Sequence, residues 1–326
     1  MTKRQGIQWG QRVSLTVFLA MIMVAVSFVW LELTVHAGFR GKGPGCGGTL
    51  LDGDEQNGDT ILLLNSGGGT WDSGGPTITK SLQIEGGWQL KSGSTCSSST
   101  VYTDTSNFEF VGPITRSTAN EFGQPVISVD LNGLTLTVKH VIFDQTGFVV
   151  EGAGINGVIS NSATLLLENV AFASSSGGAD KGAGLHLEVR GNSRLVISGS
   201  QFMTNTAQDT GGGFEIEVYD GSQVVINNSQ VFGNRALNGN GGGGRILIDR
   251  GTVTIGDSVF SGNLGNQGQG GGLSVEAIGS GPAYLILQNT VISGNTASFG
   301  DNDLHISGTI TVLDKQVFLP IVMKGS

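Results

Sequence analysis

Residues 194–234 read RLVISGSQFMTNTAQDTGGGFEIEVYDGSQVVINNSQVFGN, and this stretch contains the repeat that decides the fold. An apolar triplet ending at Ile197 is followed five positions later by Phe202 and three positions after that by Asn205. The same spacing returns 29 residues further on, where the corresponding residues are Ile226, Val231 and Asn234. Between the two copies, three glycines precede residues 214–218, in which apolar and polar residues alternate as in a half-buried strand.

Aligned along the chain, the repeats give three columns of apolar residues. The first contains Val138, Leu167, Ile197, Ile226, Ile255 and Leu287, which are 29 to 32 residues apart. The second contains Phe143, Phe172, Phe202, Val231, Phe260 and Ile292, and the third contains Leu187, Ile216, Ile248 and Val275. A unit of this size cannot bury its own apolar side, so we expect the units to stack and enclose the columns.

This pattern predicts an all-β fold, a single-stranded right-handed parallel β-helix with three strands in each coil of about 29–32 residues. Parallel strands need covered faces and long crossovers, and in a coil the crossover of each strand is the rest of its own turn. Helical solenoids require a 3.6-residue period and strong helix formers, whereas these repeats are rich in Gly, Ser, Thr, Asn and Val. A propeller needs antiparallel strands and usually a longer period.

The N-terminal residues 1–37 are predicted to be a signal peptide. Lys3, Arg4 and Arg12 precede an apolar run over residues 13–30, and short side chains lead to a cleavage position after Ala37. The alternative is an uncleaved anchor, because 18 apolar residues are borderline for crossing a bilayer. We therefore expect a secreted or cell-surface protein, with no membrane span if the leader is cleaved, a β-helix over residues 38–316 and an apolar tail or cap over 317–326.

Charge and cysteine content limit the classes of function. The formal net charge is -9, and no basic stripe is present, so we expect no binding to nucleic acid. Two cysteines, Cys46 and Cys96, follow the leader, and an even number in an exported chain favours one disulfide over two buried thiols. No Cys-x-x-Cys pair occurs, which argues against redox catalysis and thiolate zinc sites.

The repeats resemble a known group of proteins. Phe-x-x-Asn motifs at 202–205 and 260–263 alternate with Gly-Gly-Gly-apolar motifs at 211–214 and 270–273, as in the repeat region of polymorphic outer-membrane proteins. The segments Gly58-Asp-Thr-Ile and Ile78-Thr-Lys-Ser-Leu-Gln-Ile-Glu-Gly-Gly are similar to the start of many right-handed β-helices of the pectate-lyase-like superfamily. The resemblance covers about residues 48 to 312, implies the same fold and suggests adhesion.

Asparagine forms the most regular polar column. Asn205, Asn234, Asn263 and Asn295 occupy equivalent positions, and we expect a structural ladder of amides that hydrogen-bond from coil to coil at a corner. A row of ligand-binding amides is the alternative. Asp301-Asn-Asp303 offers oxygen ligands for calcium, but a solvated turn is the simpler interpretation. The histidines show no metal-ligand spacing, so the sequence predicts neither a metal nor a cofactor.

Charged residues recur at outward positions of the third strand. They are His186, Glu188 and Arg190 in one coil, Glu215, Glu217 and Tyr219 in the next, and Arg245 and Asp249 in the one after that. Glu188, Glu217 and Asp249, with Arg190 nearby, would suit a polysaccharide lyase or glycoside hydrolase if they converged in a cleft. A wet strand face with complementary charges is the simpler interpretation. Because no catalytic set is recognisable, we expect a non-enzymatic protein for adhesion or surface structure, whose partner is an extracellular polysaccharide or a cell-surface molecule.

Overall fold

A computed structural model describes most of the chain after the predicted leader. The described ranges are 39–42, 55–64, 70–72, 77–90, 108–110, 115–118, 125–144, 152–175 and 179–318. The chain divides into the units Met1–Ala37 and Gly38–Ser326, and all described residues belong to the second. The leader, Cys46, Cys96 and residues 319–326 lie outside these ranges, so the signal peptide, the disulfide and the apolar cap stay predictions.

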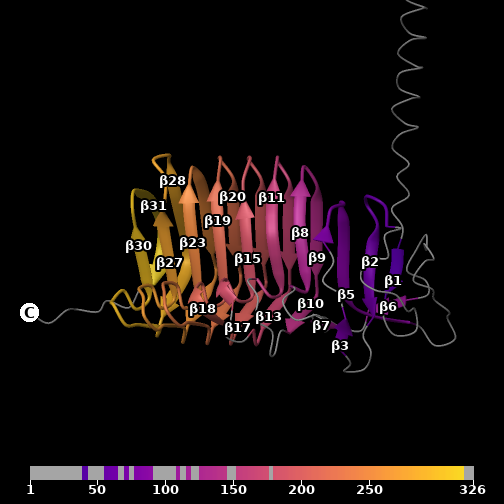
Figure 1. The fold of residues 1–326 in the computed structure, drawn as a ribbon, viewed down its shortest axis with the longest axis horizontal. Helices are drawn as coiled ribbons and strands as arrows, with labels where there is room; N and C mark the ends of the chain where they lie inside the picture. The colour runs from indigo at the N-terminus through magenta and orange to yellow at the C-terminus, as the bar shows by residue number, and fades with distance from the viewer. Residues whose placement is uncertain are drawn as a thin grey trace, which may run out of the picture. The chain divides into compact units, whose positions relative to one another are not determined.

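The described residues form a parallel β-solenoid, and no helix occurs in these ranges. Figure 1 shows its strands stepping along the long axis of the coil in chain order, from indigo to yellow. None of these segments supplies a helix long and apolar enough to cross a membrane.

Three predicted strands recur in each coil. The first strands are β1 (Phe39–Lys42), β2 (Thr60–Leu64), β5 (Leu82–Leu90), β9 (Thr135–Lys139), β12 (Thr164–Glu168), β16 (Arg194–Ser198), β20 (Gln223–Asn227), β24 (Gly251–Gly256), β28 (Ala283–Ser293) and β31 (Ile310–Phe318). The second strands are β3 (Thr70–Asp72), β7 (Thr115–Thr118), β10 (Val141–Asp144), β13 (Ala171–Ala173), β17 (Gln201–Met203), β21 (Gln230–Phe232), β25 (Val259–Ser261) and the end of β28. β6 (Phe108–Phe110) pairs antiparallel with β5.

The third strands form a separate eight-stranded sheet, here called the third sheet. It comprises β4 (Thr77–Ile78), β8 (Ile127–Asn132), β11 (Ile155–Ser160), β15 (Leu185–Val189), β19 (Phe214–Tyr219), β23 (Gly244–Asp249), β27 (Leu273–Ala277) and β30 (Leu304–Ser307). The later coils also carry a fourth, short strand that was not predicted. These strands are β14 (Ala179–Lys181), β18 (Thr206–Thr210), β22 (Arg235–Ala236), β26 (Leu264–Gly265) and β29 (Thr296–Ala297).

The strand register confirms the first two apolar columns. Ile197 pairs with Leu167 on one side and with Ile226 on the other, and Ile226 pairs with Ile255. In the second column Phe143, Phe172 and Phe202 are successive partners, and their rings stack at 4.9 and 4.8 Å between centroids. All these side chains are buried, so the interior is a continuous apolar core that no single coil could form.

The predicted third column is wrong at one position. Ile246, not Ile248, lies between Ile216 and Val275, and Ile248 pairs with Val218. The reason is that Gly244 is the partner of Phe214, so the fourth glycine of the run 241–244 already belongs to β23.

The four asparagines of the predicted column are bonded to one another across the coils. The Oδ1 of Asn234 accepts hydrogen bonds from the backbone N and the Nδ2 of Asn205 at 3.0 and 2.9 Å. Its Nδ2 donates to the carbonyl of Phe202 and to Oδ1 of Asn263. Asn263 bonds Asn295 in the same way, and the Oδ1 of Asp303 accepts from Asn295 at the end of the row.

Serine hydroxyls repeat this arrangement at another corner. The Oγ of Ser229 accepts the backbone N–H of Ser200, and the Oγ of Ser258 accepts the backbone N–H of Ser229. These buried ladders satisfy backbone groups that the bends between strands leave without a sheet partner.

Candidate functional site

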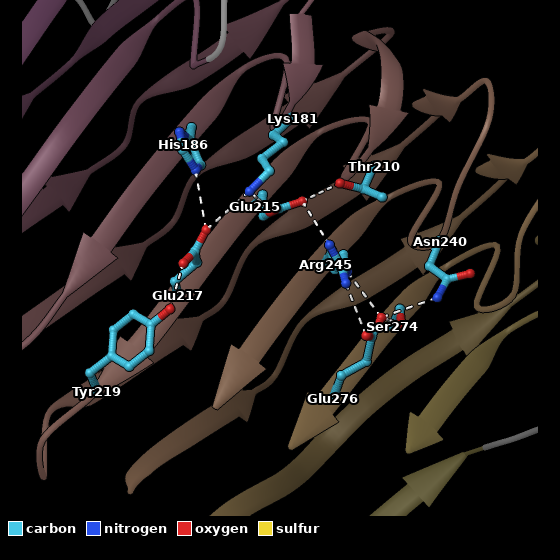
Figure 2. Close-up of polar contacts among 10 residues, drawn as sticks. All are labelled: Lys181, His186, Thr210, Glu215, Glu217, Tyr219, Asn240, Arg245, Ser274 and Glu276. Atoms are coloured by element: carbon cyan, nitrogen blue, oxygen red, sulfur yellow. Dashed lines mark hydrogen bonds and ion pairs between the residues drawn. The ribbon is translucent and has the colours of Figure 1, made fainter. Parts of the chain in front are cut away.

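A cluster of charged side chains lies on the outward face of the third sheet, beside the short strands β14 and β18. Figure 2 shows its members, which we call the charged network: Lys181, His186, Thr210, Glu215, Glu217, Tyr219, Asn240, Arg245, Ser274 and Glu276. The parallel register brings them together, since His186, Glu215, Arg245 and Ser274 occupy one row of partners across β15, β19, β23 and β27.

The predicted catalytic candidates do not all meet. Glu188 and Glu217 are register partners on adjacent coils. Asp249 is the partner of Tyr219, two positions further along the strand than Leu247, which is the partner of Glu217. Arg190 forms a 2.9 Å ion pair with Glu188. Of the four candidates, only Glu217 belongs to the charged network.

Glu215 is the most deeply placed charge of the network, with an exposed fraction of 0%. Its Oε2 accepts a hydrogen bond from Thr210 and lies 3.6 Å from Nη1 of Arg245. Its Oε1 lies 3.5 Å from Nζ of Lys181 and accepts no hydrogen bond from the described part of the chain. A buried carboxylate of this kind is tolerated only when cations compensate it.

Glu217, two residues after Glu215 on β19, contacts the same ammonium of Lys181. Its Oε1 lies 3.5 Å from Lys181 Nζ and 3.7 Å from His186 Nε2, and its Oε2 accepts a 2.7 Å hydrogen bond from Tyr219. His186, followed by Tyr219 and Lys181, lowers the pKa of Glu217 to about 2 against the effect of burial. Burial opposes the charge on Lys181, but Glu215 and Glu217 outweigh it and raise the pKa of the lysine.

Glu276 and Arg245 form the other half of the network. The guanidinium donates two 2.9 Å hydrogen bonds, from Nε to Oε1 and from Nη2 to Oε2, so the pair is bidentate. Asn240 and Ser274 also donate to Oε1 of Glu276. Burial acts to raise the pKa of Glu276, but the Arg245 hydrogen bonds and the other donors outweigh burial and hold it at about 2.

The network combines groups able to hold a metal ion. One ligand atom from each of His186, Glu215 and Glu217 lies within 4.8 Å of the other two. Sequence spacing did not reveal this group, because its histidine and its carboxylates belong to different coils. Lys181, Thr210 and Asn240 were also missed, since they belong to the short fourth strands or to the turn that follows one. Glu276 was not singled out either.

In the turn Asp301-Asn-Asp303, one side-chain oxygen of each residue contacts the protein. Asp301 pairs with His305 at 2.8 Å, the Oδ1 of Asn302 accepts the backbone N–H of Ala297, and Asp303 accepts from Asn295. These contacts favour a structural role, in which Asp303 ends the asparagine row.

A second feature is a pair of open hollows on the outward face of the second strands. The first is lined by His140, Ile142, Asn169, Val170, Ala171, Gly199 and Gln201. The second is lined by Gln230, Phe232, Val259 and Ser261. The hollows adjoin, because Gln201 and Gln230 are register partners on β17 and β21. We call the two together the amide groove.

No protein-family model, curated protein or solved structure matches this chain. The parallel β-solenoid is therefore established by the strand pairing itself.

Proposed function

We propose that this chain is an exported, non-enzymatic β-helix protein, secreted or held at the cell surface, that adheres to an extracellular polysaccharide through the amide groove. The leader-like residues 1–37 support export. The resemblance of the repeats to polymorphic outer-membrane proteins, and of the first coils to the pectate-lyase-like superfamily, supports a surface role. The observation that carries the proposal is the composition of the groove.

The groove suits a neutral, repeating ligand. Gln201 and Gln230 supply donors and acceptors for hydroxyl groups, while Phe232 and Val259 supply apolar surface for the C–H faces of sugar rings. Successive coils are about 4.8 Å apart, so Gln201 and Gln230 lie on adjacent coils and Val259 follows on the next. A polymer lying along the coil axis therefore meets two amides and then apolar surface. Because the chain is acidic, polyanionic polysaccharides are disfavoured.

The electrostatics of the charged network favour binding over catalysis. Glycoside hydrolysis needs a carboxylic acid whose pKa is raised, so that it can donate a proton. Glu217 and Glu276 have instead a pKa lowered to about 2. Glu188 is paired with Arg190. Glu217 and Glu276 are therefore ionised and hydrogen-bonded at neutral pH, which supports the adhesive alternative over a lyase or glycosidase.

The test is binding of the full-length chain to immobilised polysaccharides. We expect retention on at least one neutral polymer, from a panel of xylan, β-glucan, galactomannan and chitin, and weaker retention on alginate or pectate. The double variant Q201A/Q230A should weaken binding by about tenfold or more, since several hydrogen bonds of about 1 kcal/mol each are lost.

The matched control is Q223A, which removes an exposed glutamine from β20 on a different face. Its binding should equal that of the unaltered chain. Failure of every polymer to bind, or equal weakening by Q223A, would contradict the adhesive role. Release of unsaturated or reducing ends from any polymer would establish the enzyme alternative instead.

A further inference from the structure

Three side chains on β15 and β19 converge on one point at the surface of the third sheet. His186 Nε2 lies 3.7 Å from Glu217 Oε1, and the ligand atoms of His186, Glu215 and Glu217 all lie within 4.8 Å of one another. Two ligands bonded to one ion at about 2.1 Å are separated by less than about 4.2 Å, so a small contraction closes the site. We propose that these three side chains bind a first-row divalent transition-metal ion.

The buried carboxylate is the independent observation that points to a cation. Glu215 is fully buried, and its Oε1 accepts no hydrogen bond from the described residues. This oxygen lies on the side of the carboxylate that shares Lys181 with Glu217. The ammonium of Lys181 lies 3.5 Å from this oxygen, and the same ammonium lies 3.5 Å from Oε1 of Glu217. Figure 2 shows the lysine reaching in between the two carboxylates.

The surrounding side chains orient the ligands toward that point. Thr210 and Arg245 hold Oε2 of Glu215, and Tyr219 holds Oε2 of Glu217. Each carboxylate therefore keeps its Oε1 for the shared site. Arg245 is itself fixed by its two hydrogen bonds to Glu276. Metal sites in proteins are generally supported by such outer hydrogen bonds, which fix ligand orientation and raise affinity.

Ligand chemistry selects the class of ion. One imidazole nitrogen and two carboxylate oxygens suit zinc, manganese or cobalt, whereas calcium prefers six or more oxygens. The two carboxylates neutralise the charge of a divalent ion. When bound, the ion takes the place of the ammonium of Lys181. That lysine has a side-chain exposed fraction of 38%, so it can move into solvent. Three protein ligands leave a coordination position for water or another ligand.

This proposal goes beyond adhesion and does not depend on it, because the metal site is on the third sheet and the amide groove is on the second strands. The test is equilibrium dialysis of the chelator-treated full-length chain against zinc alone. We expect one bound ion, with E217Q and H186A each weakening binding by at least about tenfold. Y219F leaves every ligand in place but removes the hydroxyl that orients Glu217. It should weaken zinc binding by about tenfold.

Two further variants separate a metal site from an ion-pair network. K181M removes the competing ammonium, so zinc should bind severalfold more tightly. E188Q, on the adjacent coil and paired with Arg190, is the matched control and should leave zinc binding unchanged. Cobalt should give the visible absorption of a four-coordinate site in the unaltered chain, and E217Q should abolish it.

The proposal would be overturned if folded E217Q and H186A, checked by circular dichroism, bind zinc as tightly as the unaltered chain. It would equally be overturned if K181M failed to bind zinc, because the cluster would then be an ion-pair network that holds the lysine alone.

Discussion

At the corners between strands, individual polar side chains form the hydrogen bonds that backbone groups cannot form with a neighbouring strand. Asn234 is 1% exposed, and its amide bonds three neighbours: the backbone and side chain of Asn205, the carbonyl of Phe202 and the side chain of Asn263. A buried amide with all its groups paired adds stability, whereas its removal leaves the partners unpaired in a dry interior.

Replacing Asn234 with alanine is therefore expected to reduce the free energy of unfolding by about 3 kcal/mol, since the buried N–H of Asn205 and the carbonyl of Phe202 lose their partner. Urea denaturation followed by circular dichroism measures the loss. The matched control is N238A, because the exposed amide of Asn238 makes one bond, to the carbonyl of Gln208, and should cost less than about 1 kcal/mol. Equal losses in the two variants would contradict a structural ladder.

The lowered pKa of Glu276 predicts how the free energy of unfolding depends on pH. Its pKa is about 2 in the folded chain, against an ordinary value of 4.5. Between these values the unfolded chain binds the proton and the folded chain does not, so stability from this group is full above about pH 5 and is lost as the pH falls toward 2. E276Q should be less stable than the unaltered chain at pH 7, and the difference should shrink toward pH 2. Urea midpoints measured across this range provide the check, and a difference independent of pH would refute it.

At the scale of elements, a large residue on one strand of the third sheet is accommodated by a glycine on the next strand. Leu185, Phe214, Gly244 and Leu273 are successive register partners. The Phe214 ring lies against Gly244, where a Cβ would come within 2.3 Å of Cζ of the ring. The fourth glycine of the run 241–244 thus makes room for an aromatic ring, which also contacts Phe202 at 5.1 Å between centroids.

G244A is expected to lower the free energy of unfolding by about 2 kcal/mol through overpacking. F214L in the same chain should recover part of this loss, because leucine occupies the equivalent position in the two coils that flank the Phe214–Gly244 pair. A double-mutant cycle from urea denaturation measures the coupling. The control is G265A, whose added Cβ would meet its nearest atom at 3.7 Å and should change stability little. Additive effects of F214L and G244A would show that the ring and the glycine are not coupled.

The whole molecule is a stack in which each coil contacts its immediate neighbours. Asn205, Asn234 and Asn263 mark equivalent points in successive coils. Stability in such a stack is approximately a sum over coils and the interfaces between them. The fold should therefore tolerate the deletion of one or more complete coils.

Deleting residues 206–263, two complete coils, is expected to leave a folded protein with reduced stability. The deletion joins Asn205 to Leu264 and places Leu185 over Leu273, so both the corner and the apolar column continue. Deleting 206–248 removes one and a half coils, puts strands of different type in register and should abolish cooperative unfolding. Circular dichroism with thermal unfolding distinguishes the two, and similar behaviour of both deletions would contradict the stacking of independent coils.

Much of the fold was predictable because its information is periodic. The spacing of Ile197, Ile226 and Ile255 identified the vertical neighbours, and the strand register confirms them. The prediction was wrong at Ile248 because Ile246 and Ile248 are both buried apolar residues on one face of β23, and the glycine run 241–244 does not show that the strand begins at Gly244. The fourth strands were missed because pairs such as Arg235–Ala236 are too short to show alternation.

The amino-acid sequence alone determined that coils of about thirty residues stack with like over like, because a repeated apolar spacing can be buried in no other way. Only the tertiary structure decided which charged groups meet. Lys181, Glu215 and Arg245 come from three coils, and their approach depends on the register of β14, β19 and β23 and on how far each corner projects over the sheet. A shift of one residue turns a side chain to the other face of a strand, so contacts between coils depend on a register that a periodic sequence specifies only approximately.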